Sequence, residues 1–241
     1  MKTLIFDISA DFGHFRKMYT TSSPLSYSFI PPTAVYGLLS AILGLPKENN
    51  EYLQTINGQT VKLAIQIINP VKKTRVGLNW INTKGNVWIP KQRREGARTQ
   101  IRTEWLKQPK FRLYVHLEDS IIHERLADYV KQHKTVYSIS MGISELLADF
   151  QYVDEQILQT VSVSQIQEIV TVLPIDSICE RTVEFEHGKS YFKERMPIDM
   201  NDERIVSRYD AILYETTGKS ILARVSSCFL TEAGEGVVFL T

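Results

Sequence analysis

The chain has 241 residues, 43% of them hydrophobic, and its 28 Lys and Arg residues balance 27 Asp and Glu residues to leave a net charge of +1. This composition predicts a soluble globular protein of one large domain or two small ones. It excludes a membrane-spanning chain, because no apolar run approaches the roughly 18 residues of a span, and a disulfide framework, because Cys179 and Cys228 are isolated. No signal-type leader precedes the first predicted strand, so we expect a cytoplasmic protein without membrane contact.

The first third of the chain alternates strand and helix patterns. Residues 2–9 place apolar side chains on one side of an extended segment, which predicts a strand. Residues 33–45 follow a pair of prolines and are apolar nearly all round, which predicts a buried helix. Its small positions, such as Gly37 and Ser40, would let it lie close against a sheet. Residues 61–68 alternate apolar and polar side chains and predict a second strand.

Three further elements follow a long insertion. Residues 111–117 alternate again and predict a third strand, and residues 120–133 have helical apolar spacing with Asp119 or Ser120 as the N-cap. Residues 135–141 are rich in strand formers and predict the fourth strand. The order strand, helix, strand, strand, helix, strand is that of the ferredoxin-like unit, which RNA-recognition motifs share, so the predicted fold class is α+β.

The C-terminal part of the chain has a different character. Short strand-forming runs at residues 168–173, 182–185 and 211–215 are separated by turn signals, which predicts a lobe of mainly antiparallel strands. We therefore predict two domains, a ferredoxin-like domain over residues 1–149 and a smaller β-rich lobe over residues 150–241.

The insertion between the second and third predicted strands carries most of the positive charge. Residues 72–112 contain 12 Lys and Arg against only two acids, Glu95 and Glu104, so this segment has a charge of +10 and the rest of the chain −9. Since strands two and three form a hairpin in this unit, about 40 extra residues must project as a finger, inserted over residues 72–110. All three tryptophans lie in it. Cations beside flat rings suit single-stranded nucleic acid. The alternative, a solvated hairpin, fits poorly because Lys and Glu normally mix on solvated surfaces.

A second group of cations and aromatic rings lies in the loop after the first strand. Together the loop and the finger supply the candidate RNA-binding residues, which are Arg16, Lys17, Tyr19, Tyr27, Lys72, Lys73, Arg75, Trp80, Trp88, Arg93, Arg94, Arg98, Arg102 and Trp105. The five histidines are too scattered for a metal-ligand pair, and no glycine motif that would cradle a phosphate is present. We therefore expect neither a metal nor a cofactor.

Signatures of enzymes are largely absent. Residues 142–146 begin like the nucleophile elbow of serine hydrolases but lack its closing glycine. A metal-independent ribonuclease needs only a base, an acid and a cation around one phosphate, and His14, Lys17 and Tyr19 are close enough in sequence to supply them. The competing interpretation, which we favour, makes these residues phosphate contacts in a binding loop.

Four segments resemble a known family. They are residues 10–16 (ADFGHFR) with 26–44 (SYSFIPPTAVYGLLSAILG), residues 141–149 (MGISELLAD), and residues 191–214, which include Met196, Pro197 and Arg204. These segments resemble CRISPR-associated family five, the RAMP-fold subunits at the crRNA 5′ end of type I Cascade complexes, and are most similar to the type I-B branch.

The resemblance implies a role in antiviral defence or RNA-guided DNA targeting. The ferredoxin-like domain and its inserted hairpin, called the thumb in the family, would hold the 5′ handle of the crRNA, with Arg16 and Lys17 in the handle-binding loop. The thumb would contact the backbone subunit, and other surfaces would meet the large subunit that recognises the motif flanking the target DNA. One branch of the family cleaves precursor crRNA with a Tyr, a Lys and an adjacent His, whereas this chain has only His133-Lys134, in reverse order.

Three functional hypotheses follow. The first is a non-catalytic RNA-binding subunit of a ribonucleoprotein complex. The second is a metal-independent endoribonuclease that processes precursor crRNA. The third is a scaffold whose cationic finger binds an acidic protein.

Overall fold

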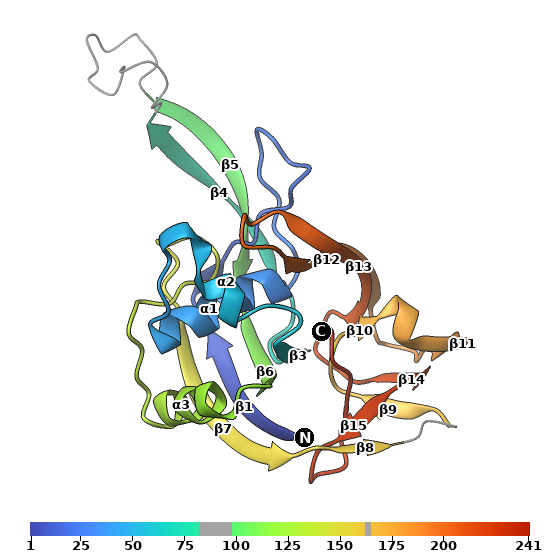
Figure 1. Cartoon of the computed structure of the whole chain (residues 1–241). Coiled ribbons are helices and arrows are strands. Elements are labelled where there is room, and N and C mark those ends of the chain that lie inside the picture. The colour runs from blue at the N-terminus through green and yellow to red at the C-terminus, as the bar shows by residue number, and fades with distance from the viewer. Residues whose placement is uncertain (82–97, 162–164) are drawn as a thin grey trace.

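The computed structural model describes residues 1–81, 98–161 and 165–241. Its centre is a four-stranded sheet of spatial order β3-β6-β1-β7, in which every neighbouring pair is antiparallel (Figure 1). The strands are β1 (Lys2–Ser9), β3 (Val61–Ile67), β6 (Lys110–Leu117) and β7 (Asp149–Ile157). The first three confirm the strands predicted over residues 2–9, 61–68 and 111–117.

Alternate residues of these strands pack on opposite sides of the sheet. Leu4 and Phe6 of β1 belong to the main hydrophobic cluster, which also contains residues of both long helices. Ile5, between them, belongs to a separate cluster with Leu158 and Val237. Because successive side chains of a strand point to opposite faces, helices cover one face of the sheet and C-terminal segments cover the other.

The two long helices confirm their predictions and have clear end signals. Helix α1 (Pro32–Leu43) begins at a proline and is followed by Gly44, whose φ of 73° turns the backbone so that the Leu45 N–H donates to the Ser40 carbonyl at 2.9 Å. Helix α3 (Ser120–Lys131) is capped by Asp119, whose carboxylate accepts two N–H groups of the first turn at 2.8 and 3.1 Å. In the described part of the chain, no helix is long and apolar enough to cross a membrane.

The fourth strand of the sheet is β7, so the prediction of a strand over residues 135–141 was wrong. This segment runs along the end of α1, where the N–H groups of Val136 and Tyr137 donate to the carbonyls of Ile42 and Ala41 at 3.2 and 3.0 Å. The last carbonyl groups of a helix have no partner within the helix. They therefore bind a segment whose strand-forming residues suit an extended backbone.

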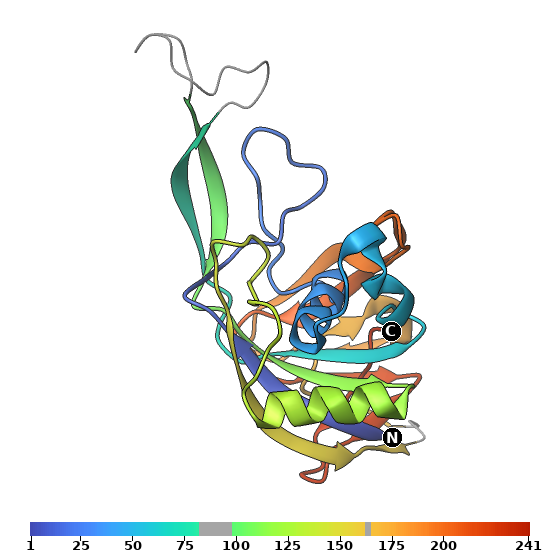
Figure 2. The same ribbon diagram turned by 60° about the vertical axis from the view of Figure 1, so that its left-hand side comes forward.

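An antiparallel hairpin connects β3 to β6 and projects from the body of the molecule (Figures 1 and 2). It consists of β4 (Lys73–Ile81) and β5 (Arg98–Lys107), and the two-residue strand β2 (Phe12–Gly13) pairs with the base of β5. The middle of the predicted finger, residues 82–97, lies outside the described residues.

The rest of the chain forms the short helix α2 and two further sheets. Strands β10, β13 and β12 form one sheet, and β11-β14-β9-β16-β15-β8 form another. The bounds are α2 (Tyr52–Thr55), β8 (Gln159–Val161), β9 (Gln167–Ile169), β10 (Leu173–Pro174), β11 (Ile178–Glu184), β12 (Tyr191–Met200), β13 (Val206–Glu215), β14 (Ile221–Val225), β15 (Cys228–Leu230) and β16 (Gly236–Val237), with 3-10 turns at Glu48–Asn50 and Ile175–Ser177. The predicted run at residues 168–173 is divided between β9 and β10.

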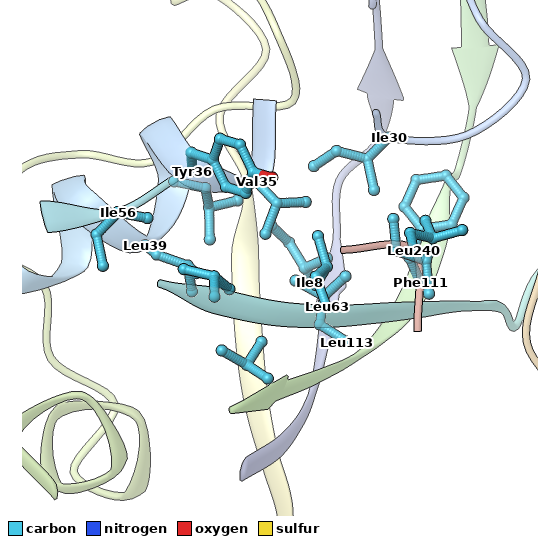
Figure 3. Close-up of a cluster of buried hydrophobic side chains, with 14 of the residues drawn as sticks. Ile8, Ile30, Val35, Tyr36, Leu39, Ile56, Leu63, Phe111, Leu113 and Leu240 are labelled. Atoms are coloured by element: carbon cyan, nitrogen blue, oxygen red, sulfur yellow. The ribbon is translucent and has the colours of Figure 1, made fainter. Parts of the chain in front are cut away.

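The main hydrophobic cluster joins the N-terminal and C-terminal parts of the chain. Figure 3 shows Ile8 and Leu63 of the sheet beside Tyr36 of α1, with Leu240 from the C-terminal end in the same cluster. The Tyr36 hydroxyl donates to the carbonyl of Ile198 in β12 at 3.0 Å. The division into two domains at residue 149 stays a prediction, and these contacts cross it.

Candidate nucleic-acid interface

The β4–β5 hairpin has two chemically different faces. Directly opposed residues of an antiparallel pair point to the same side. On the first side, which we call the cationic face, the opposed pairs are Lys73 with Leu106, Arg75 with Glu104, Gly77 with Arg102, Asn79 with Gln100, and Ile81 with Arg98. On the second side, the apolar face, the pairs are Thr74 with Trp105, Val76 with Thr103, Leu78 with Ile101, and Trp80 with Thr99. The strand register thus gathers the arginines on one side.

The arginines of the cationic face are exposed and without carboxylate partners. Arg75, Arg98 and Arg102 are all exposed, and across residues 1–81, 98–161 and 165–241 no Asp or Glu forms an ion pair with them. The same holds for Lys72 and Lys107 at the base of the hairpin. Guanidinium groups in this state can bind a phosphate through two parallel hydrogen bonds without first breaking an ion pair.

Beside the hairpin lies the N-terminal loop, residues 14–28, which stands between the hairpin and β12–β13 (Figure 1). Two glutamates hold it, one on each side. The Glu104 carboxylate accepts the Ser26 N–H at 3.2 Å and forms an ion pair with Lys73 at 3.1 Å. The Glu194 carboxylate accepts the Ser28 N–H at 2.9 Å and forms an ion pair with Lys17. Each glutamate therefore binds one backbone amide of the loop and one lysine.

This arrangement uses two of the predicted RNA-binding lysines as internal partners. The Lys17 side chain is only 14% exposed. Burial by itself would lower the pKa of Lys17, but the hydrogen bond and charge of Glu194 outweigh it and raise the pKa. Lys73 also donates to the Ser26 carbonyl at 2.8 Å. Both charges are compensated by a carboxylate of the protein, whereas those of Arg75, Arg98 and Arg102 are not paired with any described acid.

The other candidates of the loop differ in exposure. Arg16 is exposed, and its guanidinium donates to the carbonyls of Thr20 and Thr21 at 2.9 and 3.4 Å. Tyr19 is 72% exposed. Tyr27 is buried beneath the Lys17 ammonium, which lies 5.7 Å from its ring centroid, and burial raises the pKa of Tyr27 to about 12. Tyr19 can therefore stack on a base, whereas Tyr27 serves the core.

The trio considered for RNA cleavage is engaged in other contacts. His14 is buried, its Nδ1–H donates to the Glu104 carbonyl at 2.7 Å, and burial lowers its pKa. Lys17 is bound by Glu194, and only Tyr19 faces the solvent. Among the described residues, no group of three or more His, Cys, Asp or Glu side chains is placed to hold a metal ion.

The tryptophans of the finger fall in three different settings. Trp80 is 43% exposed on the apolar face. Trp105 is half-buried at the base of the hairpin, and its ring centroid lies 5.4 Å from that of Phe12. Trp88, like Arg93 and Arg94, belongs to residues 82–97 and lies outside the described residues.

Sequence reasoning missed a groove of about 690 Å³ between α1 and residues 137–142. Lys47, Tyr137 and Arg204 contribute cationic and aromatic side chains to its lining. Gly37 also lines it, and a Cβ added there would meet no atom within 4 Å. The prediction that Gly37 lets the helix lie close against a sheet was therefore wrong. The sequence signal that could have revealed the groove was the position of Gly37 on the side of α1 opposite its buried face.

The chain is similar to known proteins in sequence and in fold. Residues 3–212 match the family model described as CRISPR-associated protein (Cas_Cas5). No curated protein matches the chain.

Two solved structures share the fold. A CRISPR protein from Archaeoglobus fulgidus is 16% identical with a TM-score of 0.59, and the match covers 99% of both chains. A chain of a CRISPR RNA-guided surveillance complex is 9% identical with a TM-score of 0.53, and the match covers 91% of both chains. Because the family model spans most of the sequence, the chain belongs to the CRISPR-associated Cas5 family.

Proposed function

We propose that this protein is the non-catalytic subunit of a type I CRISPR effector complex, Cascade, that holds the 5′ handle of the crRNA. Its family and its structural likeness to a chain of an RNA-guided surveillance complex support a crRNA-associated effector subunit. The observation that carries RNA binding is the cationic face of the hairpin. Its arginines are exposed and have no carboxylate partner in the described ranges, so they can neutralise a run of phosphates.

We assign the central sheet with α1 and α3 to a ferredoxin-like lobe and the β4–β5 hairpin to the thumb of the family. The strand order β3-β6-β1-β7 supports this, because the first and third strands of a ferredoxin-like unit, here β1 and β6, lie in the middle of its sheet. In that unit one helix connects the first strand to the second and another connects the third to the fourth, as α1 and α3 do here. The assignment to the type I-B branch rests on the motif resemblance alone.

The apolar face of the hairpin suits a protein partner. Val76, Leu78 and Ile101 are only half-buried there, and Trp80 is exposed. Exposed apolar and aromatic groups gathered on one side are typical of protein interfaces. We assign this side to the backbone subunit and the cationic side to RNA. Other surfaces would meet the large subunit near the motif that flanks the target DNA.

RNA affinity of a charge-reversed hairpin tests the proposal. The double variant Arg75→Glu, Arg102→Glu should bind crRNA handle oligonucleotides at least about tenfold more weakly. The magnitude of the slope of log K against log salt should decrease by about 1.4, because two phosphate contacts are lost. The matched control is Lys62→Glu with Lys134→Glu, which reverses two cations outside the hairpin and the loop. Equal affinity and salt slope in the two variants would overturn the proposal.

Two further measurements separate this function from the alternatives. Incubation of the pure protein with repeat RNA in EDTA should leave the RNA intact, whereas specific cleavage that leaves a cyclic phosphate would show an endoribonuclease. After nuclease treatment, no acidic protein should remain bound to the cationic face. Persistent binding to an acidic protein in the absence of RNA would instead favour the scaffold.

A further inference from the structure

A second surface with the chemistry of a nucleic-acid contact lies where the N-terminal loop meets β12–β13. It consists of Met18, Tyr19, Arg195 and Tyr209, and we call it the tip patch. The Arg195 guanidinium lies 5.1 Å from the centroid of the Tyr209 ring. The Tyr209 hydroxyl in turn donates to the Met18 sulfur, which joins the tip of the loop to β13.

The tip patch is exposed although the loop that carries it is held in place. Met18 is 63% exposed and Tyr19 is 72% exposed. Glu104 and Glu194 fix the loop from its two sides, as described above. Large apolar groups displayed on a fixed loop have already lost conformational freedom, so a ligand that covers them incurs a smaller ordering cost.

The surroundings of the tip patch are cationic. On β12, Lys193 and Arg195 are exposed, and neither forms an ion pair with any residue that the structure describes. The acid between them, Glu194, points to the opposite side of the strand and is engaged with Lys17 and the Ser28 amide. The nearby Asp210 is paired with Arg208 at 3.3 Å. The nearby acids are therefore already compensated.

Arg16 connects the tip patch with the hairpin. It lies on the same loop, is exposed, and uses its guanidinium only for loop carbonyls among the described residues. Exposed guanidinium groups thus occur on the hairpin, on the loop and on β12. A polyanion that leaves the cationic face can follow these groups across the loop, and this continuity favours RNA over a protein partner.

We propose that the tip patch is a second contact for the same single-stranded RNA, an inference that rests on the proposed function. One base stacks on the exposed ring of Tyr19, and Arg195, held over Tyr209, binds a neighbouring phosphate. This role extends the RNA surface from the hairpin to the C-terminal part of the chain.

Binding of RNA oligonucleotides of two lengths tests the proposal with the full-length protein. The double variant Tyr19→Ala, Arg195→Ala should bind an oligonucleotide of about 12 nucleotides about tenfold more weakly, and one of about 4 nucleotides with unchanged affinity. Tyr19→Phe should retain wild-type affinity because it keeps the ring. Ultraviolet crosslinks to the long RNA should map to the peptides that contain Tyr19 and Tyr209.

The possible results are distinct. Unchanged affinity of the double variant for the long RNA, with normal binding by the wild type, overturns the tip patch and leaves the proposed function standing. Failure of the wild type to bind RNA of either length refutes the proposed function and the tip patch with it. Loss of a protein partner by the double variant, with RNA affinity intact, makes the patch a protein surface and overturns the inference.

Discussion

The hairpin and the N-terminal loop lie side by side and both carry basic residues, but they use them differently. The arginines of the cationic face form no ion pair with an acid among the described residues, and Glu104, opposite Arg75, is paired with Lys73 instead. Lys17 and Lys73 each lie against a glutamate that also binds a loop amide. The arginines of the hairpin present their charge to the solvent, whereas Lys17 of the loop and Lys73 at the base of β4 use theirs to hold the loop in place. The number of basic residues in a segment therefore overstates the charge available to a ligand.

The largest expected effect comes from breaking the attachment of the loop at its start. Gly142 has a φ of 101°, and a Cβ there would lie 1.9 Å from the His14 carbonyl oxygen. Gly142→Ala should lower the free energy of unfolding by about 4 kcal/mol, because both the backbone angle and the contact are unfavourable. Urea unfolding measures this free energy. Gly188→Ala is the control, because Gly188 also has a positive φ but a Cβ added there would meet no atom within 4 Å. Similar losses in the two variants would contradict the role of the contact.

The next effect separates a structural ion pair from a surface one. Glu194→Gln leaves the Lys17 ammonium nearly buried without its counter-charge and should cost about 3 kcal/mol in the free energy of unfolding. Glu180, which is 74% exposed and paired with Arg224, provides the control. Glu180→Gln should change the same quantity by less than about 0.5 kcal/mol. If both variants are equally stable, the loop is not held by Glu194.

Single arginine substitutions on the hairpin should leave the stability of the protein unchanged and weaken RNA binding. Arg75→Gln and Arg102→Gln should each leave the free energy of unfolding within about 0.5 kcal/mol, because neither side chain is buried. Each should reduce the magnitude of the salt slope of RNA binding by about 0.7. Filter binding over a series of salt concentrations measures the slope. A loss of stability without a change in slope would show that these arginines have a structural role like that of Lys17 and Lys73.

The smallest effect is a pH dependence of the loop attachment. Burial lowers the pKa of His14 below its ordinary 6.5, so the folded state binds fewer protons than the unfolded state near that pH. The contribution of neutral His14 to stability is complete above pH 6.5 and is lost as the pH falls through the lowered pKa. His14→Asn keeps a donor for the Glu104 carbonyl and should make the decline in unfolding free energy shallower below pH 6.5. Identical pH profiles of wild type and variant would show that His14 does not titrate on unfolding.

Much of the architecture follows from short stretches of sequence. The apolar alternation of β1, β3 and β6 and the end signals of α1 and α3 predicted these elements closely, because side-chain period and helix capping are local properties. The length of the insertion between the second and third predicted strands also predicted a projecting hairpin. The fourth strand was missed because residues 135–141 have strand-forming side chains but bind the carbonyl groups at the end of α1.

The sequence by itself determined where β1, β3, β6, α1 and α3 form, that positive charge gathers between β3 and β6, and which family motifs are present. Only the tertiary structure decided which cations remain available to a ligand. The Glu194 that neutralises Lys17 lies far away in the sequence, and the register of β4 against β5 places the arginines on one face. Ion pairing and strand register depend on which distant segments come together, and a local pattern carries no record of that.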